Sequence, residues 1–148
     1  MIMISQLNKN RVYIGIDFGL KKIGVAVGQP ITNHANPITI INNDTEAYNQ
    51  IDLIIQEWLP HAIIIGYPFA IKKNHVHKNL DIFIKNLEKN YADKIDIIPH
   101  SEILSTEEAK TKLRELRKSN IISKKKINVD DISACLILES WFNDNITR

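Results

Sequence analysis

The chain alternates between apolar and other residues in two segments near its start, 11–18 and 22–28. In the first segment the β-branched residues Val12, Ile14 and Ile16 occupy alternate positions, and the second segment is apolar on both sides. Period-two alternation rich in β-branched residues predicts strands. Gly19 lies between the segments and permits a sharp turn. The pattern therefore predicts two paired strands, with Asp17 where the first strand ends.

Downstream, runs of strand length alternate with apolar residues at helical spacing. Three short apolar runs predict further strands, at 37–41, 61–66 and 95–99. Apolar residues three and four positions apart predict four helices. These helices are expected at 43–58, 78–91, 105–116 and 128–142. Asn43 or Asp44 should cap the first of them.

This order of elements predicts an α/β fold. Three antiparallel strands come first, and two strands reached by crossover helices follow them. The expected architecture is a mixed five-stranded sheet with helices on both faces. We expect residues 11–148 to form one domain, because a chain of 148 residues is long enough for a single core. Residues 1–10 are expected to form a flexible tail.

The composition is that of a globular protein without membrane segments. Hydrophobic residues make up 44% of the chain and charged residues 24%. No apolar run approaches the roughly 20 residues that a membrane helix requires, and the start lacks the basic region of a signal peptide. Cys135 is the only cysteine, so an intrachain disulfide is impossible. We expect a cytoplasmic protein with a buried structural thiol at Cys135.

Basic residues are clustered although the net charge is only +2. Eight basic residues and one acidic residue lie between Lys110 and Lys126, and smaller clusters occur elsewhere. Each cluster can be a solvated face, but together they favour a polyanionic partner. Thr106 either caps a helix or bonds a phosphate at its N-terminus. The candidate nucleic-acid contacts are Lys21, Lys22, Lys72, Lys73, Thr106, Lys124, Lys125 and Lys126.

Other side chains that can bind metals or bases have simpler interpretations. His75 and His77 form an H-x-H pair, but no cysteine or third histidine is close in sequence. Zinc binding is therefore disfavoured. Trp58, Trp141 and Phe142 occupy helical core positions, so we do not expect them to stack on bases.

Four motifs occur in the order, and at about the spacing, of a known family. They are Asp17-Phe18-Gly19 followed by a basic turn and IGVAVG, Gly66-Tyr67-Pro68, Ser101-Glu102-Ile103-Leu104-Ser105-Thr106, and Asp130 followed by Ser133-Ala134 and Ile137-Leu138-Glu139-Ser140. With these motifs the chain resembles the YqgF (RuvX) family of ribonuclease-H-like resolvases over nearly its whole length. The resemblance implies a ribonuclease-H-like nuclease domain.

The resemblance also implies a catalytic, metal-binding triad of Asp17, Glu102 and Asp130. Ligands of α/β sheets gather near the carboxyl ends of strands, and carboxylates there can hold two Mg²⁺ or Mn²⁺ ions for phosphodiester hydrolysis. Simpler roles stay open for each residue. Asp17 can be a turn residue, Glu102 a solvated residue before a helix, and Asp130 a partner of the helix dipole.

The chain departs from the family pattern at several positions. Ser101-Glu102-Ile103 stands where the family usually has Asp-Glu-Arg, and Ile103 cannot neutralise phosphate charge. Leu20 replaces a usual threonine, and Ser119-Asn120 replaces a glycine-rich segment. Because the three presumed metal ligands remain, we expect a weaker or differently selective enzyme rather than an inactive one.

The sequence thus predicts a metal-dependent endonuclease that binds nucleic acid and no membrane, as a monomer or weak homodimer. Precursor ribosomal RNA is the favoured substrate, with processing of the 5′ end of pre-16S rRNA, because family members are linked to ribosome maturation. Branched DNA is the alternative, in a Holliday junction resolvase that would need two copies. A non-catalytic nucleic-acid-binding module is a second alternative, and a phosphotransferase of the actin and sugar-kinase class is a third.

Overall fold

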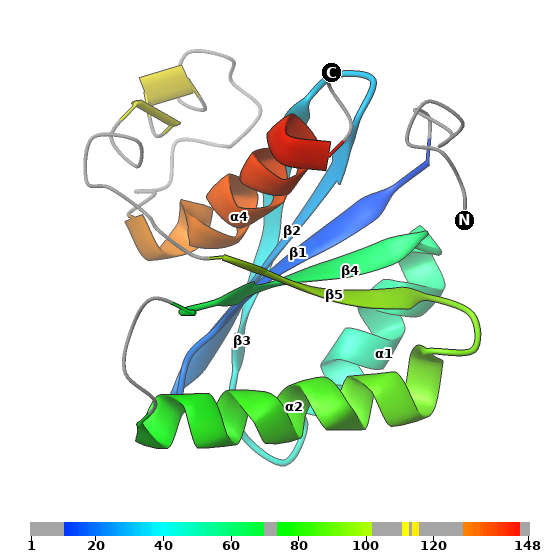
Figure 1. Ribbon diagram of the computed structural model, residues 1–148, viewed down its shortest axis with the longest axis vertical. Coiled ribbons are helices and arrows are strands. Elements are labelled where there is room, and N and C mark those ends of the chain that lie inside the picture. Colours follow the sequence, from blue (N-terminus) through cyan, green and yellow to red (C-terminus); the bar gives the residue numbers. More distant parts are fainter. Residues whose placement is uncertain (1–10, 70–73, 102–110, 113, 116–128, 146–148) are drawn as a thin grey trace.

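Five strands form one mixed sheet with the order β3-β2-β1-β4-β5 (Figure 1). The structure, a computed structural model, describes residues 11–69, 74–101, 111–112, 114–115 and 129–145, with the backbone alone for 129–131. The strands are β1 (Tyr13–Phe18), β2 (Lys22–Gln29), β3 (His34–Asn42), β4 (Ala62–Tyr67) and β5 (Asp96–Ser101). The first three are antiparallel, and β4 and β5 run parallel to β1. The predicted sheet is confirmed.

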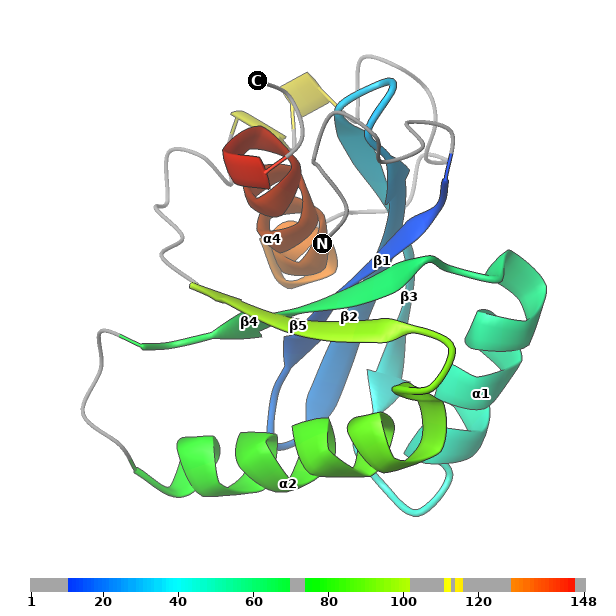
Figure 2. The same cartoon turned by 45° about the vertical axis from the view of Figure 1, so that its right-hand side comes forward.

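Helices cover both faces of this sheet, as predicted. Helices α1 (Ala47–Trp58) and α2 (His75–Tyr91) pack on one face, and α4 (Val129–Asn145) packs on the other (Figures 1 and 2). The described residues of the predicted 105–116 helix, at 111–112 and 114–115, are helical. Within the described part of the chain, no helix is both long and apolar enough to span a bilayer.

The sheet separates two hydrophobic cores because successive side chains of a strand point to opposite faces. Ile14 and Ile16 of β1 belong to the core beneath α1 and α2, which is rich in isoleucine. Tyr13 belongs to the core beneath α4, where the strands contribute several alanines. The smaller side chains on the α4 face let this helix lie close to the sheet.

Helix α4 lies close to the sheet at Gly15 of β1. A Cβ atom on Gly15 would lie 2.6 Å from the carbonyl oxygen of Ala134 and 2.8 Å from the Cβ atom of Leu138. Nearer the start of β1, the ring of Tyr13 lies 5.3 Å from that of Trp141. Helix α4 therefore runs opposite to β1, and its first turn lies towards the carboxyl end of that strand.

Some local predictions were wrong. The N-cap of α1 is Glu46, without a side-chain hydrogen bond, and neither Asn43 nor Asp44 caps this helix. The Oδ1 atom of Asp44 instead accepts the N–H of Glu46 at 2.9 Å, and the side-chain amide of Asn43 donates to the carbonyl of Gly19 at 2.8 Å. Trp58 is 37% exposed, because it ends α1 beyond the edge of the core.

Candidate active site

Asp17 is the second-to-last residue of β1, the central strand of the sheet. It pairs with Gly24 of β2 and is half-buried. Tyr13 and Gly15 face α4, so the alternation of the strand directs Asp17 to the same face. The predicted carboxylate therefore lies on the α4 side of the sheet, near the carboxyl end of β1.

The carboxyl ends of β1, β4 and β5 lie at one edge of the sheet because these strands are parallel. Ile16 of β1 pairs with Ile65 of β4, and Tyr67 at the end of β4 pairs with Ser101 at the end of β5. Glu102 follows Ser101 directly in sequence but lies outside the described residues. The predicted role of Glu102 as a metal ligand is therefore supported only by the position of its neighbour Ser101, at the carboxyl end of β5.

Asp130 belongs to the first turn of α4, and its side chain lies outside the described part of the structure. In the helix, position 130 comes one turn before Ala134, which contacts Gly15. Since α4 runs opposite to β1, that turn lies beyond Gly15 in the direction of Asp17. The backbone is thus compatible with the approach of Asp130 to Asp17, and the triad as a whole stays a prediction.

Among the side chains that the structure describes, no three His, Cys, Asp or Glu residues form a group that could hold a metal ion. Two of the three predicted ligands, Glu102 and Asp130, have side chains outside that set. The chemistry of the predicted donors still suits a hard divalent cation, because all of them are carboxylates.

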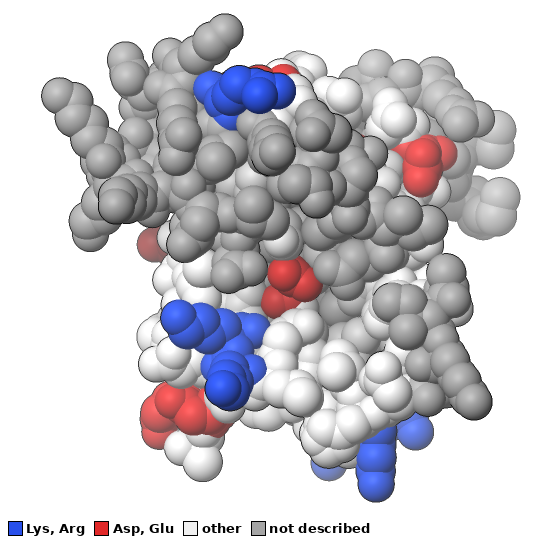
Figure 3. Space-filling model, turned by 90° about the vertical axis from the view of Figure 1, so that its left-hand side faces the viewer, with Lys and Arg blue, Asp and Glu red and all other residues white. Residues whose placement is uncertain are grey.

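The edge that carries Asp17 is bordered by charged residues of both signs. Figure 3 views the molecule onto the side towards which β1, β4 and β5 run, and it shows an acidic group near the centre with basic groups above and below it. Lys21 and Lys22 are exposed at this end of the hairpin: Lys21 lies in the turn between β1 and β2, and Lys22 is the first residue of β2. The other candidate contacts lie outside the described residues: Lys72, Lys73, Thr106, Lys124, Lys125 and Lys126.

Lys112 belongs to the basic cluster that we interpreted as a binding surface for a polyanion, yet it is only 4% exposed. Its ammonium group forms an ion pair with Glu139 of α4. The same carboxylate accepts the backbone N–H of Ala35 in β3 at 2.8 Å. Lys112 therefore connects its helical segment to α4 and is not free to bind nucleic acid.

His100 of β5 joins the end of this strand to α4. Its Nε2 atom lies 3.1 Å from Ser140 Oγ and 3.7 Å from Asp144 Oδ2. Burial lowers the pKa of His100, and the nearby Asp144 carboxylate opposes this effect. This contact was not predictable from the sequence, because the partners of His100 are about 40 residues away in the chain.

Two further predictions agree with the structure. Cys135 is fully buried, and burial raises the pKa of its thiol to about 12, as expected for a structural cysteine. His77 is buried and bonded within the protein: it completes a capping box with Asn74, and its Nε2 atom donates to the carbonyl of Pro68 at 3.0 Å. This use of both ring nitrogens leaves no lone pair for zinc.

Comparisons with known proteins agree with this architecture. The family model described as "RuvX: Holliday junction resolvase" matches residues 11–144. A protein of Buchnera aphidicola subsp. Baizongia pistaciae, named "Putative pre-16S rRNA nuclease", is 42% identical over 135 residues, which cover 88% of this chain and 96% of the relative. A protein of Legionella pneumophila (strain Lens) with the same name is 38% identical over 138 residues, covering 90% and 96%.

Solved structures with low sequence identity share the fold. The RuvC structure of Thermus thermophilus superposes with a TM-score of 0.61 at 11% identity, covering 90% of this chain and 95% of that one. The Fowlpox virus resolvase in complex with Holliday junction DNA gives a TM-score of 0.56 at 15% identity, covering 90% and 97%. These neighbours support the ribonuclease-H-like fold predicted from the sequence.

Proposed function

Because this chain belongs to the RuvX (YqgF) family, we propose that it is a metal-dependent endonuclease that processes the 5′ end of precursor 16S ribosomal RNA. The observation that carries this proposal is the position of Asp17. A half-buried carboxylate lies at the carboxyl end of the central strand, on the face that α4 covers. Relatives that span nearly the same length are named "Putative pre-16S rRNA nuclease".

In this proposal, Asp17, Glu102 and Asp130 hold Mg²⁺ or Mn²⁺. Two such ions, held by these carboxylates, would activate a water and stabilise the leaving oxygen of the phosphodiester. The contribution of the chain is to keep three carboxylates at one corner of the sheet, where only a cation relieves their mutual repulsion. Gly15 serves this purpose by letting α4 approach β1.

Substrate binding in this proposal relies on the lysines around the site. Lys21 and Lys22 are exposed beside the end of β1 that carries Asp17. Contacts between lysines and phosphates position a nucleic acid without selecting its sequence. The remaining lysines assigned from the sequence, at 72–73 and 124–126, are proposed to extend the same surface. A ribosomal RNA precursor as substrate implies action in the cytoplasm.

Resolution of four-way DNA junctions is the second candidate, because the matching family model is described by that activity. Symmetric cleavage of a junction requires two active sites, and hence a dimer. Processing of an RNA end requires only one site. The relatives named as pre-16S rRNA nucleases favour the RNA substrate. A binding module without catalytic activity is the remaining alternative, since Ile103 replaces the usual arginine.

A cleavage assay with Mn²⁺ tests these alternatives directly. Labelled precursor 16S rRNA and a four-way DNA junction are offered side by side to the wild type and to Asp17→Asn. Asp93→Asn is the matched control, because Asp93 is an exposed carboxylate that precedes β5. We expect cleavage of the RNA by the wild type and the control, with none by Asp17→Asn or in EDTA.

Each other result has a defined meaning. Cleavage of the junction alone would replace the RNA substrate by branched DNA. RNA binding that Asp17→Asn does not weaken, without cleavage by any variant, would identify a binding module. Cleavage that persists in Asp17→Asn would remove this residue from the catalytic site.

A further inference from the structure

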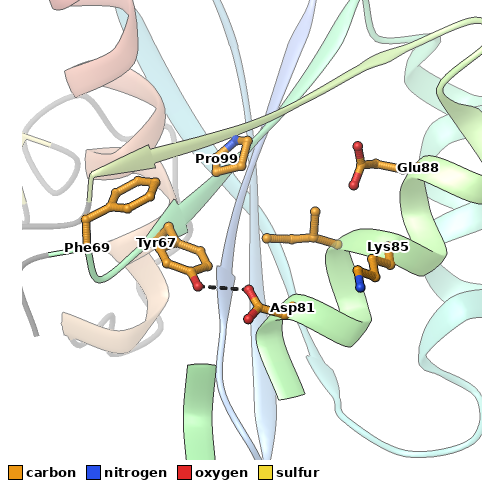
Figure 4. Close-up of a pocket in the computed structure, with 7 residues that line it drawn as sticks. Tyr67, Phe69, Asp81, Lys85, Glu88 and Pro99 are labelled. Carbon is orange, nitrogen blue, oxygen red and sulfur yellow. Dashed lines mark hydrogen bonds between the residues drawn. The ribbon is translucent and has the colours of Figure 1, made fainter. Parts of the chain in front are cut away.

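A hollow of about 340 Å³ lies between helix α2 and the ends of strands β4 and β5 (Figure 4). Tyr67, Phe69, Ile84 and Pro99 provide its apolar walls. Asp81, Lys85 and Glu88, all from α2, provide its charged groups. We propose that this hollow binds an unpaired nucleobase of the substrate, next to the phosphate that is cut. The inference rests on the proposed nuclease function.

Phe69 offers an aromatic face to solvent at the mouth of this hollow. Its side chain is 61% exposed, whereas Tyr67 is only 8% exposed. The two rings lie 4.5 Å apart with an interplanar angle of 40°. An exposed aromatic ring backed by a buried one is a typical platform for stacking bases of single-stranded nucleic acids.

Hydrogen bonds hold this platform in place before a ligand binds. The hydroxyl of Tyr67 donates to Asp81 Oδ1 at 2.8 Å, and the N–H of Phe69 donates to the carbonyl of Tyr67 at 2.9 Å. The Nε2 atom of His77 donates to the carbonyl of Pro68 at 3.0 Å. The N–H of Asn74 donates to the other ring nitrogen of His77 at 3.2 Å. A platform that is already ordered loses little conformational entropy on binding.

The charges around the hollow favour a base over a phosphate. Two carboxylates and one ammonium group line it, so a phosphate would meet net negative charge. Asp81 is already engaged by Tyr67. Glu88 can accept a hydrogen bond from the amino group of a base, and Lys85 can donate one to a ring nitrogen or carbonyl. The site is therefore suited to a neutral ring with polar edges.

The position of the hollow connects it to the candidate active site. Pro99 pairs with Ile65, which in turn pairs with Ile16, the residue before Asp17. Neighbouring strands lie about 5 Å apart. Tyr67 points to the α2 side of the sheet, and Asp17 is directed to the α4 side. A strand of nucleic acid that crosses this edge can place a phosphate at Asp17 and an adjacent base at Phe69.

The base must be unpaired to reach this site. Bases within a duplex are stacked on both faces, and proteins read them there only by their edges. A base that leaves the stack can be taken up between aromatic and apolar side chains. The hollow therefore indicates a substrate whose nucleotides are single-stranded at the site of cleavage, rather than a continuous duplex.

The test measures RNA binding in the Asp17→Asn background, which separates binding from cleavage. The probe is a hairpin RNA with an unpaired tail that carries 2-aminopurine, whose fluorescence falls when it stacks. We expect quenching on binding, and Phe69→Ala should abolish the quenching and raise the Kd roughly 5- to 150-fold. A fully paired RNA should bind both proteins equally. Leu53→Ala is the control, because Leu53 is similarly exposed (65%) but lies on α1.

Further variants separate stacking from a general loss of structure. Phe69→Tyr should keep quenching and affinity, whereas Phe69→Leu should lose both while matching the thermal melt of the parent. Equal Kd values and equal quenching for the Phe69→Ala protein and its parent would overturn the base site. Equal losses in Phe69→Tyr and Phe69→Leu would overturn it as well.

Cleavage measured in parallel, with Asp17 restored, keeps the two proposals distinct. Absence of cleavage together with Phe69-dependent quenching would overturn the nuclease function and leave the base site standing. Cleavage together with Phe69-independent binding would overturn the base site alone.

Discussion

Helix α4 approaches strand β1 so closely at Gly15 that a Cβ atom there would lie 2.6 Å from the carbonyl oxygen of Ala134. The helix turn before Ala134 contains Asp130, and the strand residue two positions after Gly15 is Asp17. The contact therefore fixes the spacing between the two elements that carry these predicted ligands. A change at Gly15 should affect both the stability of the protein and the geometry of its site.

We predict that Gly15→Ala lowers the free energy of unfolding by about 1–3 kcal/mol, the usual cost of overpacking a core. The added methyl group would meet backbone, which cannot rotate away as a side chain can. Urea denaturation measures the loss. The loss of cleavage activity should be larger than the loss of folded protein, because the added methyl group forces α4 away from β1 and so moves the predicted ligands apart.

Thr39→Ala in β3 serves as the control, since Thr39 is exposed and its loss opens no contact with α4. A Gly15→Ala protein with wild-type stability and activity would show that the close approach of α4 has no role in holding the site.

The ion pair between Lys112 and Glu139 gives a second prediction. Lys112→Met should lower the free energy of unfolding by about 1–3 kcal/mol, because the Glu139 carboxylate loses a buried charged partner. The loss stays within this range because Glu139 keeps the N–H of Ala35 and is partly exposed. Denaturant titration of the single variants Lys112→Met and Glu139→Gln, and of the double variant, measures the coupling.

The double variant should be less destabilised than the sum of the two single variants. Lys89→Met is a suitable control, since Lys89 is exposed on α2. Additive effects of Lys112→Met and Glu139→Gln would contradict the pairing.

These examples show which features of the fold the sequence encodes locally. The alternation of residues in β1 predicted its two faces, because burial imposes a period of two on a strand. The spacing of Leu80, Phe83 and Leu87 predicted the buried face of α2 in the same way. Such patterns depend on neighbours in the chain, so they are visible without the structure.

Contacts between distant residues were not predictable in this way. Lys112 belongs to a basic cluster in sequence, but its partner Glu139 is 27 residues away and buries it. His77 acts as a capping residue, a role that its residue type does not suggest. Asp17 was identified from a motif, and the structure adds the face towards which it is directed. Glu102 and the side chain of Asp130 lie outside the described residues, so the triad still depends on the motif.

The third prediction concerns His61 and the dependence of stability on pH. Burial lowers the pKa of His61, and the Arg11 guanidinium, which donates to Nδ1 at 2.6 Å, lowers it further; Asp96 acts in the opposite direction. The folded state therefore binds fewer protons than the unfolded state near the ordinary histidine pKa of about 6.5. The contribution of neutral His61 is fully present above that pH and is lost as the pH falls through the folded-state pKa.

His61→Gln should consequently lose less stability than the wild type between pH 7.5 and pH 5. Urea midpoints at the two pH values measure the difference, in buffer without metal ions. His75→Gln controls for the removal of an exposed histidine. Parallel pH profiles of the wild type and His61→Gln would mean that His61 has the same pKa in the folded and the unfolded protein, which would contradict the prediction.

The last prediction concerns the lysines beside Asp17. A protein that contacts phosphates releases counterions, so the logarithm of its affinity falls linearly with the logarithm of the salt concentration. Each lysine that contacts a phosphate contributes close to one unit of this slope for a duplex, and somewhat less for a single strand. Lys21→Ala and Lys22→Ala should each reduce the slope by about one unit or less, without changing the preference among RNA sequences. Filter binding of the pre-16S RNA at several salt concentrations measures the slope.

Lys94→Ala is the matched control, because Lys94 is exposed but precedes β5, at the opposite end of that strand from Ser101. Its removal should leave the slope unchanged if the RNA lies across the carboxyl ends of β1 and β4. A reduced slope for Lys94→Ala, with no change for Lys21→Ala or Lys22→Ala, would place the RNA at the opposite end of the strands and separate it from Asp17. Because Phe69 binds a base rather than a phosphate in our proposal, Phe69→Ala should weaken binding by the same factor at every salt concentration.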